Sequence, residues 1–355
     1  MADRIRVLIV DDSRLFRAAL EEALSGQPDI HVVGSVFSGA KAIEFIRHSP
    51  PDIVTLDVEM PEMDGVETLL AIQRLGASDP RAAAIGALMV SAYTRRGTES
   101  SVRALAAGAF DVVAKPTADT EGSGVARLRD EILPRIRAFM RRRAVATPAA
   151  PFQALPRRVP ASPRATRCIV IGASTGGPRA LCTLLPELCA ATKLPILIVQ
   201  HMPVGFTASL AASLAREANA DVVEASDLAP IEAARVYIAP GGRHLVVRGS
   251  ADAPHMGLND QPAENGCRPA VDVLFRSSAA VFGAAQLAII LTGMGRDGAA
   301  GAAVIRRAGG YVVAQDEATS VVWGMPGSAV ADGVVDVVVP LPQIAAVVAG
   351  EVRKA

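Results

Sequence analysis

The chain has 355 residues, half of them apolar, and its 36 basic side chains are balanced by 36 acidic ones. This length predicts roughly two domains, each with a sizeable core. A formal net charge of zero gives no reason to expect nucleic acid or an anionic membrane as partner. No stretch approaches the ~20 apolar residues of a membrane span, and the first residues carry no signal-peptide pattern, so we expect a cytoplasmic location.

The four cysteines form no C-x-x-C pair, so neither a zinc site nor thiol redox chemistry is expected. In a reducing compartment unpaired cysteines are usually small buried apolar side chains, and we expect that role here. They are Cys168, Cys182, Cys189 and Cys267.

Residues 1–140 alternate between short apolar runs and amphipathic segments. This alternation is typical of a parallel sheet with helices on both faces. Helical patterns occupy Arg14–Leu24 and Ala40–His48. The predicted strands are Ile5–Val10, Val32–Val36, Ile53–Asp57, Ala87–Ser91 and Val112–Ala114.

Residues 141–166 have a different composition and are predicted to be a linker. The basic run Arg141–Arg143 ends a helix; a solvated helix end is favoured over a docking site. The residues that follow hold five prolines and few large apolar side chains, which predicts an extended segment.

From Arg167 the alternation restarts and predicts a second α/β domain over residues 167–355. The chain is therefore predicted to contain two doubly wound parallel-sheet domains. The core strands expected in the second are Ile169–Gly172, Ile196–Gln200, Val236–Ala239, Leu287–Thr292 and Tyr311–Gln315.

Three carboxylates stand at strand ends in the first domain. Asp11 and Asp12 follow one strand, and Asp57 ends another. Ligands of doubly wound sheets bind at this edge, and converging carboxylates need a cation, for which Mg²⁺ is the natural choice. Ser91 and Lys115 reach the same edge, where a hydroxyl and an ammonium can stabilise a transferring phosphoryl group. The alternative is that the three carboxylates are ordinary cap and turn residues.

Residues 4–125 resemble the receiver domain of response regulators. The matching positions are Asp11-Asp12, Asp57 to Gly65, Ser91 and Lys115-Pro116. The resemblance implies a flavodoxin-like fold in which Asp57 accepts phosphate from a histidine kinase, and Ser91 and Lys115 sense the phosphoryl group.

The same resemblance implies that Mg²⁺ is held by Asp11, Asp12, Asp57 and the backbone carbonyl of Glu59. One departure concerns the switch. Three residues before the lysine, receivers usually carry an aromatic side chain that moves on activation, and this chain has Val112.

A strand in the second domain runs into a glycine-rich turn that contains Ser174. Gly172 and Gly176 flank it in a G-x-S-x-G pattern, which permits a tight turn that presents the hydroxyl near a helix N-terminus. Such turns also cradle phosphates, so this motif alone leaves both interpretations open.

Two more segments favour a nucleophile. His201 follows a predicted strand, and Asp297 follows another within a glycine loop. A serine nucleophile needs a base to take its proton and a carboxylate to orient that base. Backbone amides of the 293–295 loop or of the Ser174 turn could form an oxyanion hole.

Each of these residues has a structural alternative. His201 could be a satisfied histidine at the core edge, and Asp297 could cap the helix that starts near Gly298. His244 and His255 are competing bases but rank lower, since one follows a turn and the other lies in a polar stretch without a strand signal.

Two other enzyme classes fit poorly. The order serine, histidine, aspartate is not that of α/β-hydrolases. A dehydrogenase is disfavoured because G-x-G-x-x-G is absent and no tyrosine is followed four residues later by lysine.

Residues 167–350 closely resemble the CheB-type protein-glutamate methylesterase of bacterial chemotaxis. The resemblance is carried by the strings Ile171–Gly177, Gln200–Pro203, Gly205–Thr207, Tyr237–Gly241, Arg268-Pro269, Val271–Phe275, Leu291–Gly298, Gln315–Ser320 and Gly324–Pro326. It implies a Rossmann-like serine hydrolase domain with no cofactor in the esterase site.

By this resemblance Ser174 is the nucleophile, His201 the general base and Asp297 its orienting partner. The backbone amide of Met294 is an oxyanion donor. One departure is Ala270, where the family often has serine after Arg-Pro; we expect at most a local effect on substrate contacts.

Together the two resemblances imply phosphorylation-activated hydrolysis of glutamate γ-methyl esters on methyl-accepting chemotaxis receptors, with deamidation of chosen receptor glutamines. The partners expected are these receptors and a chemotaxis histidine kinase, with the receiver covering the triad until Asp57 is phosphorylated. Two alternatives stay open: a non-catalytic response regulator, and an esterase of a chemosensory pathway other than swimming.

Overall fold

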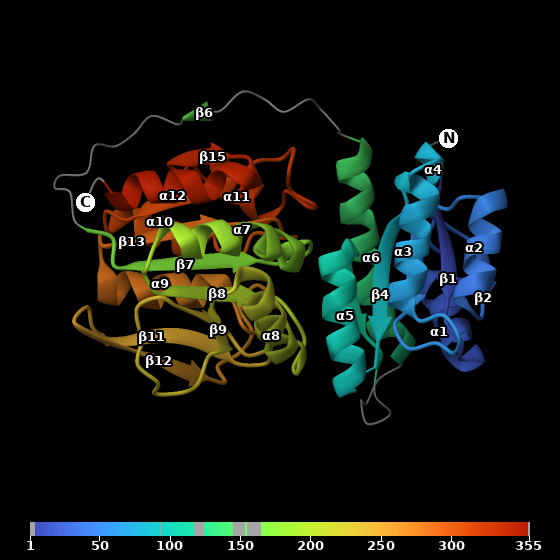
Figure 1. Cartoon of the computed structure of the whole chain (residues 1–355), viewed down its shortest axis with the longest axis horizontal. Coiled ribbons are helices and arrows are strands. Elements are labelled where there is room, and N and C mark those ends of the chain that lie inside the picture. Colours follow the sequence, from blue (N-terminus) through green and yellow to red (C-terminus); the bar gives the residue numbers. More distant parts are fainter. Residues whose placement is uncertain (1–3, 93, 117–123, 145–152, 155–164, 354–355) are drawn as a thin grey trace. The chain divides into compact units, whose positions relative to one another are not determined.

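The computed structural model describes residues 4–92, 94–116, 124–144, 153–154 and 165–353. The chain divides into two compact units, Met1–Ala144 and Val145–Ala355 (Figure 1). The helix α6 (Gly124–Ala144) continues through the basic run, so the predicted boundary at residue 140 is four residues too early. The prediction that Arg141–Arg143 ends a helix is confirmed; the difference lies in having counted this run with the linker.

The first unit is built on a five-stranded parallel sheet in the order β2-β1-β3-β4-β5. This is the flavodoxin-like order, so the predicted fold class is confirmed. Every predicted strand is present, with ends within two residues of those expected. The strands are β1 (Ile5–Val10), β2 (Ile30–Val36), β3 (Ile53–Asp57), β4 (Gly86–Ser91) and β5 (Asp111–Ala114).

Helices cover both faces of this sheet. One face carries α1, which packs against α6; on the other face α3 packs against α2, α4 and α5. Local signals set their starts: Ser13 caps α1, and Asp64 and Glu67 form a capping box on α3. The helices are α1 (Arg14–Leu24), α2 (Gly39–His48), α3 (Gly65–Gly76), α4 (Pro80–Ala83), α5 (Arg95–Ala107) and α6.

The second unit contains an eight-stranded sheet in the order β6-β15-β14-β13-β7-β8-β10-β9, parallel except for β6. β6 lies inside the predicted linker and pairs antiparallel with β15; the rest of that linker, 145–152 and 155–164, is outside the described residues. The strands are β6 (Gln153–Ala154), β7 (Cys168–Ala173), β8 (Ile196–Gln200), β9 (Asp221–Glu224), β10 (Arg235–Ile238), β13 (Gln286–Ile290), β14 (Tyr311–Gln315) and β15 (Val337–Val339).

Helices again lie on both sides of the sheet, as around β7 in Figure 1. α7 contacts α8 and α12, whereas α10 contacts α9 and α11. They are α7 (Gly177–Ala191), α8 (Phe206–Ala218), α9 (Val271–Phe282), α10 (Ala299–Arg307), α11 (Met325–Ala331) and α12 (Ile344–Arg353), with a short 3-10 turn at Leu341–Gln343.

An antiparallel hairpin of β11 (His244–Ser250) and β12 (Ala253–Asn259) packs on α9. It places His255 on a strand, which corrects the expectation that this stretch has none. Only Met256 and Gly257 of β12 are buried, so its apolar signal is weak and the pairing with β11 decides its conformation.

Within the described ranges, no helix combines the length and the apolarity needed to cross a bilayer.

Candidate functional site

The three predicted carboxylates of the first unit meet at one edge of its sheet. β1 and β3 pair so that Val10 lies beside Leu56, and Asp11 and Asp57 come next along the two strands. The ligand oxygens of Asp11, Asp12 and Asp57 all lie within 4.8 Å of one another. Asp11 and Asp57 are buried, whereas Asp12 is exposed. A group of hard oxygen donors open to solvent on one side fits Mg²⁺, which prefers a few carboxylates plus water or phosphate.

Lys115 bridges the two buried carboxylates. Its Nζ lies 2.7 Å from Asp11 Oδ2 and 2.8 Å from Asp57 Oδ2, and 4.6 Å from the centre of the Phe16 ring. Burial and the charge of Asp11 raise the pKa of Asp57 to about 6, although Lys115 opposes the shift. The lysine therefore offsets only part of the repulsion within the cluster.

Ser91 and Glu59 flank this cluster without contacting the Asp57 carboxylate through their side chains. Ser91 is buried at the end of β4 and its hydroxyl donates to the carbonyl of Ala92 at 3.2 Å. The amide of Glu59 faces Asp57 Oδ1 at 3.4 Å, and its carboxylate accepts a hydrogen bond from Thr94. The predicted residues thus share one edge, with Ser91 turned to its neighbouring backbone.

In the second unit, Ser174 and His201 lie at neighbouring strand ends. β7 and β8 pair so that Ala173 lies beside Gln200, and the next residues are Ser174 and His201. The Ser174 carbonyl accepts hydrogen bonds from Gly177 N at 2.7 Å and Gln200 Nε2 at 2.9 Å, which fixes the turn before α7. Ser174 is half-buried, so its hydroxyl lies at the surface of this edge.

Two glycines make room for the turn. Gly176 has a left-handed φ of 79° as the residue before α7. A Cβ on Gly293 would lie 2.8 Å from the Cβ of Ser174, so only glycine lets the loop after β13 approach the serine.

Asp297 meets His201 from the loop that follows β13, the other neighbour of β7. His201 Nε2 donates to Asp297 Oδ2 at 2.8 Å, and only 11% of the His201 side chain is exposed. Among the residues that the structure describes, the Ser174 hydroxyl makes no hydrogen bond. The imidazole and the carboxylate are therefore paired, while the serine hydroxyl is unengaged.

The pairing raises the proton affinity of His201. Burial acts to lower the pKa of this imidazole, but hydrogen bonds to Asp297 and Cys267 outweigh it and raise the pKa to about 9. Burial acts to raise the pKa of Asp297, but the hydrogen bond and charge of His201 overcome it and hold that pKa below its ordinary value. The resting pair is thus an imidazolium beside a carboxylate at neutral pH.

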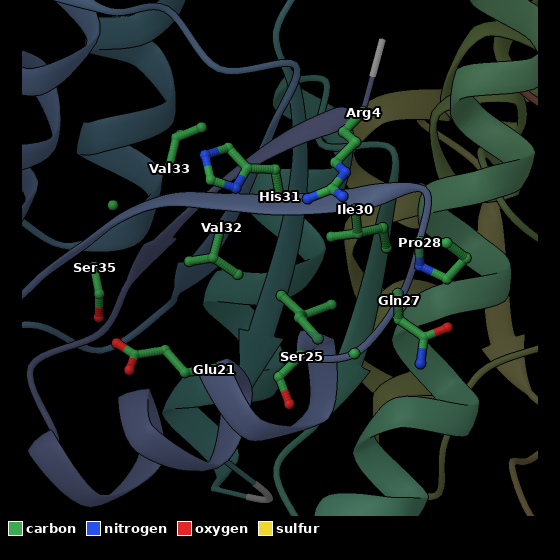
Figure 2. A pocket seen from close by; sticks show the side chains of 13 residues that line it. Arg4, Glu21, Ser25, Gln27, Pro28, Ile30, His31, Val32, Val33 and Ser35 are labelled. Carbon is green, nitrogen blue, oxygen red and sulfur yellow. The ribbon is translucent and has the colours of Figure 1, made fainter. Parts of the chain in front are cut away.

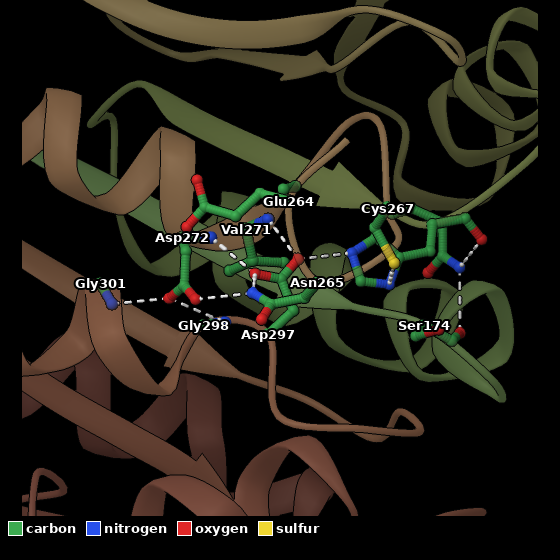
Figure 3. A network of polar contacts seen from close by, with 12 residues as sticks. Ser174, Glu264, Asn265, Cys267, Val271, Asp272, Asp297, Gly298 and Gly301 are labelled. Carbon is green, nitrogen blue, oxygen red and sulfur yellow. Dashed lines mark hydrogen bonds and ion pairs between the residues drawn. The ribbon is translucent and has the colours of Figure 1, made fainter. Parts of the chain in front are cut away.

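Asp297 is held by more than the histidine. Its oxygens also accept from Val271 N at 2.7 Å, Asp272 N at 3.0 Å and Asn265 Nδ2 at 3.1 Å (Figure 3). The first two amides belong to the N-terminus of α9. Asp297 therefore caps α9, and not the helix after Gly298 that its position in the sequence suggests.

Two protein-family models match the chain. Residues 169–348 match CheB methylesterase, and residues 7–125 match the response regulator receiver domain. A relative from Nocardioides sp. named protein-glutamate methylesterase/protein-glutamine glutaminase is 44% identical over 96% of this chain and 93% of its own length. The chain belongs to the CheB methylesterase family.

A less similar relative and a solved structure give the same family. A relative of the same name from Pyrococcus horikoshii is 38% identical over 97% of this chain and 92% of its own length. The crystal structure of the Thermotoga maritima CheB methylesterase catalytic domain is 40% identical, with a TM-score of 0.51, and covers 53% of this chain and 99% of that one.

Cys267 was expected to be a small buried apolar residue, and the structure corrects this. Its Sγ lies 3.5 Å from His201 Nδ1 and is half-buried. With His201 and Asp297 it also forms a group whose metal-ligating atoms lie within 4.8 Å of one another. No cysteine spacing signals this, because the partner is a histidine 66 residues away. Cys168, by contrast, is fully buried, and burial raises the pKa of its thiol.

The oxyanion candidate, Met294, follows Gly293, the glycine that lies against Ser174. The Met294 amide makes no backbone hydrogen bond within the described chain, whereas Gly293 N donates to Val322 O. The Gly293 carbonyl accepts from Gly324 N and Met325 N, which braces the loop. The Met294 amide is thus free to donate to a ligand.

The competing histidines have other roles. His244 is buried; its Nδ1 accepts from Ala270 N at 3.1 Å and its Nε2 lies 3.1 Å from Pro262 O. Ala270 itself is fully buried at the start of α9, so it faces the interior and not a substrate. The other departure, Val112, is buried in β5.

A separate pocket of about 670 Å³ lies along the edge strand β2 and the end of α1 (Figure 2). Its lining includes Arg4, Glu21 and His31 and none of the predicted site residues. None of the pairs that make up the two sheet-edge sites reaches it, so we place the chemistry at those edges and not in this pocket.

Proposed function

We propose that this chain hydrolyses glutamate γ-methyl esters on chemotaxis receptors and deamidates receptor glutamines, under control of phosphorylation at Asp57. The observation that carries the proposal is the buried His201–Asp297 pair beside Ser174, at the ends of three adjacent strands. The names of the full-length relatives support the substrate class.

Ser174 attacks the ester carbonyl while His201, in the neutral form, takes the hydroxyl proton. Because Nε2 is bonded to Asp297, the nitrogen that receives this proton is Nδ1. The Met294 amide donates to the oxygen that becomes negative in the tetrahedral intermediate. The intermediate collapses as His201 returns the proton to the leaving methoxide, and methanol departs.

Water then repeats the sequence on the acyl-enzyme. His201 takes a proton from the water, hydroxide adds to the acyl carbon, and the Ser174 oxygen leaves with the proton. A free glutamate and the original serine result. With a glutamine substrate the first leaving group is ammonia, and the remaining steps are the same.

In the receiver, Asp57 accepts the phosphoryl group from a histidine kinase. Mg²⁺ would be held by Asp11, Asp12, Asp57 and the Glu59 carbonyl; when bound, it neutralises charge on the phosphoryl oxygens. Lys115 already contacts the Asp57 carboxylate and would contact the phosphoryl group. The Ser91 hydroxyl donates to the Ala92 carbonyl and would rotate away from it to reach the phosphoryl group. Phosphorylation shifts the population toward a form with a more active esterase site. The cytoplasmic location stays a prediction.

The test is methanol release from methylated receptor membranes, with and without Mg²⁺ and acetyl phosphate. We expect release to rise with the phosphodonor, to vanish in Ser174→Ala, and to lose its stimulation in Asp57→Asn. Ser226→Ala, an exposed serine on the same unit, is the matched control. No release from folded wild-type protein with several receptor sources would favour a non-catalytic response regulator. Undiminished stimulation of Asp57→Asn would overturn the phosphorylation control.

A further inference from the structure

Asn265 lies at the tip of a two-residue turn beside the triad. The flanking residues exchange backbone hydrogen bonds: Glu264 N donates to Cys267 O at 3.0 Å and Cys267 N to Glu264 O at 2.9 Å. Asn265 and Gly266 both have left-handed φ, 53° and 75°. Asn-Gly is the pair that adopts this tight turn most readily. Arg276 of α9 anchors it through two hydrogen bonds to the Glu264 carboxylate, 2.6 and 2.5 Å.

This turn reaches both ends of the His201–Asp297 pair. Cys267 Sγ contacts His201 Nδ1, the ring nitrogen that does not bond Asp297, and Asn265 Nδ2 donates to Asp297 Oδ1 at 3.1 Å (Figure 3). The same Nδ2 donates to Asp272 Oδ2 at 2.9 Å. One amide group therefore stands between two carboxylates that are each only 2% exposed.

The hydrogen bonds of Asp297 divide between its two oxygens. Oδ2 accepts from His201 Nε2 and Val271 N, whereas Oδ1 accepts from Asp272 N and Asn265 Nδ2. The amides of α9 hold the carboxylate near the helix but do not separate it from the Asp272 side chain. In the part of the chain that the structure describes, the Asn265 amide is the one group that bonds both carboxylates, so its loss would leave two buried like charges facing each other.

We propose that Asn265 is a positioning residue of the esterase site: it holds the Asp297 carboxylate in the orientation that faces His201 and screens it from Asp272. Its side chain bonds Asp297 and Asp272, so it acts on the histidine through the carboxylate. The expected effect of Asn265 on turnover rests on the proposed function. Its expected effect on the pKa of His201 does not depend on any substrate.

The test uses Asn265→Gly in the full chain. Glycine keeps the left-handed turn and removes only the amide. Asn219→Gly is the matched control, because Asn219 is exposed and also left-handed (φ 47°) but ends α8. The first readout is the His201 imidazole titration by NMR, assigned with His201→Gln. The second is kcat and KM for methanol release.

We expect the pKa of His201 to fall by about 0.5 or more in Asn265→Gly, because a misaligned Asp297 no longer outweighs burial. We expect kcat to fall about 10-fold with KM within about 2-fold. Asn219→Gly should match wild type in both readouts. An unchanged or raised pKa of His201 in Asn265→Gly would overturn positioning. If the wild-type protein releases no methanol but Asn265→Gly still lowers the pKa of His201, the positioning role stands and the esterase activity is refuted.

Discussion

Asp272 and Asp297 cap each other's helices. Asp297 lies just before α10, and its carboxylate accepts from Val271 N and Asp272 N at the start of α9. Asp272 lies in the first turn of α9. Its carboxylate accepts from Gly298 N at 3.0 Å and Gly301 N at 2.6 Å, at the start of α10. Neither helix has a side-chain cap of its own. The carboxylate proposed for catalysis is therefore part of the packing between α9 and α10.

Replacing Asp272 should destabilise the second unit. Asp272→Ala leaves two buried backbone amides of α10 without acceptors, so we expect the free energy of unfolding to fall by about 2–4 kcal/mol. Urea denaturation followed by circular dichroism measures this. Asp252→Ala is the control, because its ion pair with Arg167 is largely exposed and should contribute little. Equal stability of the two variants would contradict reciprocal capping.

The pH dependence of hydrolysis should reflect His201. The base must be neutral, and its pKa is raised to about 9, so kcat/KM should increase as pH rises through the neutral range, reach half its maximum near pH 9 and level off above that. Cys267 is one cause of the raised pKa, so Cys267→Ser should move the half-maximal pH downward. The pH–rate profile is compared with that of Cys189→Ser, a half-buried cysteine on α7. A profile of Cys267→Ser that coincides with wild type would refute the role of the thiol.

The His201–Cys267 pair should make the esterase sensitive to Zn²⁺. A tetrahedral zinc bound by one nitrogen and one sulfur holds them about 3.6 Å apart, from bond lengths of about 2.05 and 2.3 Å. Nδ1 and Sγ are already 3.5 Å apart, and Asp297 orients the other ring nitrogen, as carboxylates do behind metal-bound histidines.

We therefore expect the Zn²⁺ concentration for half-inhibition to rise about 10-fold or more in Cys267→Ser. Cys182→Ser, on α7, should keep the wild-type value. Titration with a zinc-sensitive dye checks binding without any turnover. Equal inhibition of all three proteins would show that zinc acts elsewhere.

The receiver should become more stable when Asp57 loses its charge. Its pKa is raised in the fold to about 6 from an ordinary 3.8, so ionisation destabilises the folded state. The penalty is absent below pH 3.8 and complete above about 6. Without Mg²⁺, Asp57→Asn should gain about 1–2 kcal/mol at pH 7, and the gain should shrink as pH falls toward 4.

Calorimetry of the receiver transition measures this, with Glu22→Gln, an exposed acid on α1, as control. A gain that does not depend on pH would mean that the amide packs better than the carboxylate, and that the charge is not the cause.

Much of the site could be predicted because it depends on local pattern. Apolar runs mark buried strands, and Asp11, Asp57, Ser174 and His201 are polar residues at or just past their ends. The carboxyl ends of parallel strands share one edge, so chain position alone brings these residues together. Asp297 follows the same rule, although its loop carries it seven residues beyond β13.

Residue patterns along the chain thus specify the two α/β units, their order and the sheet edges at which we place the chemistry. The tertiary structure decided which groups meet there: the thiol of Cys267 on His201, the amide of Asn265 between Asp272 and Asp297, and the pairing of β11 with β12. These contacts join segments that no periodicity links, because hydrogen-bond partners across an edge are selected by loop paths and packing, and not by spacing along the chain.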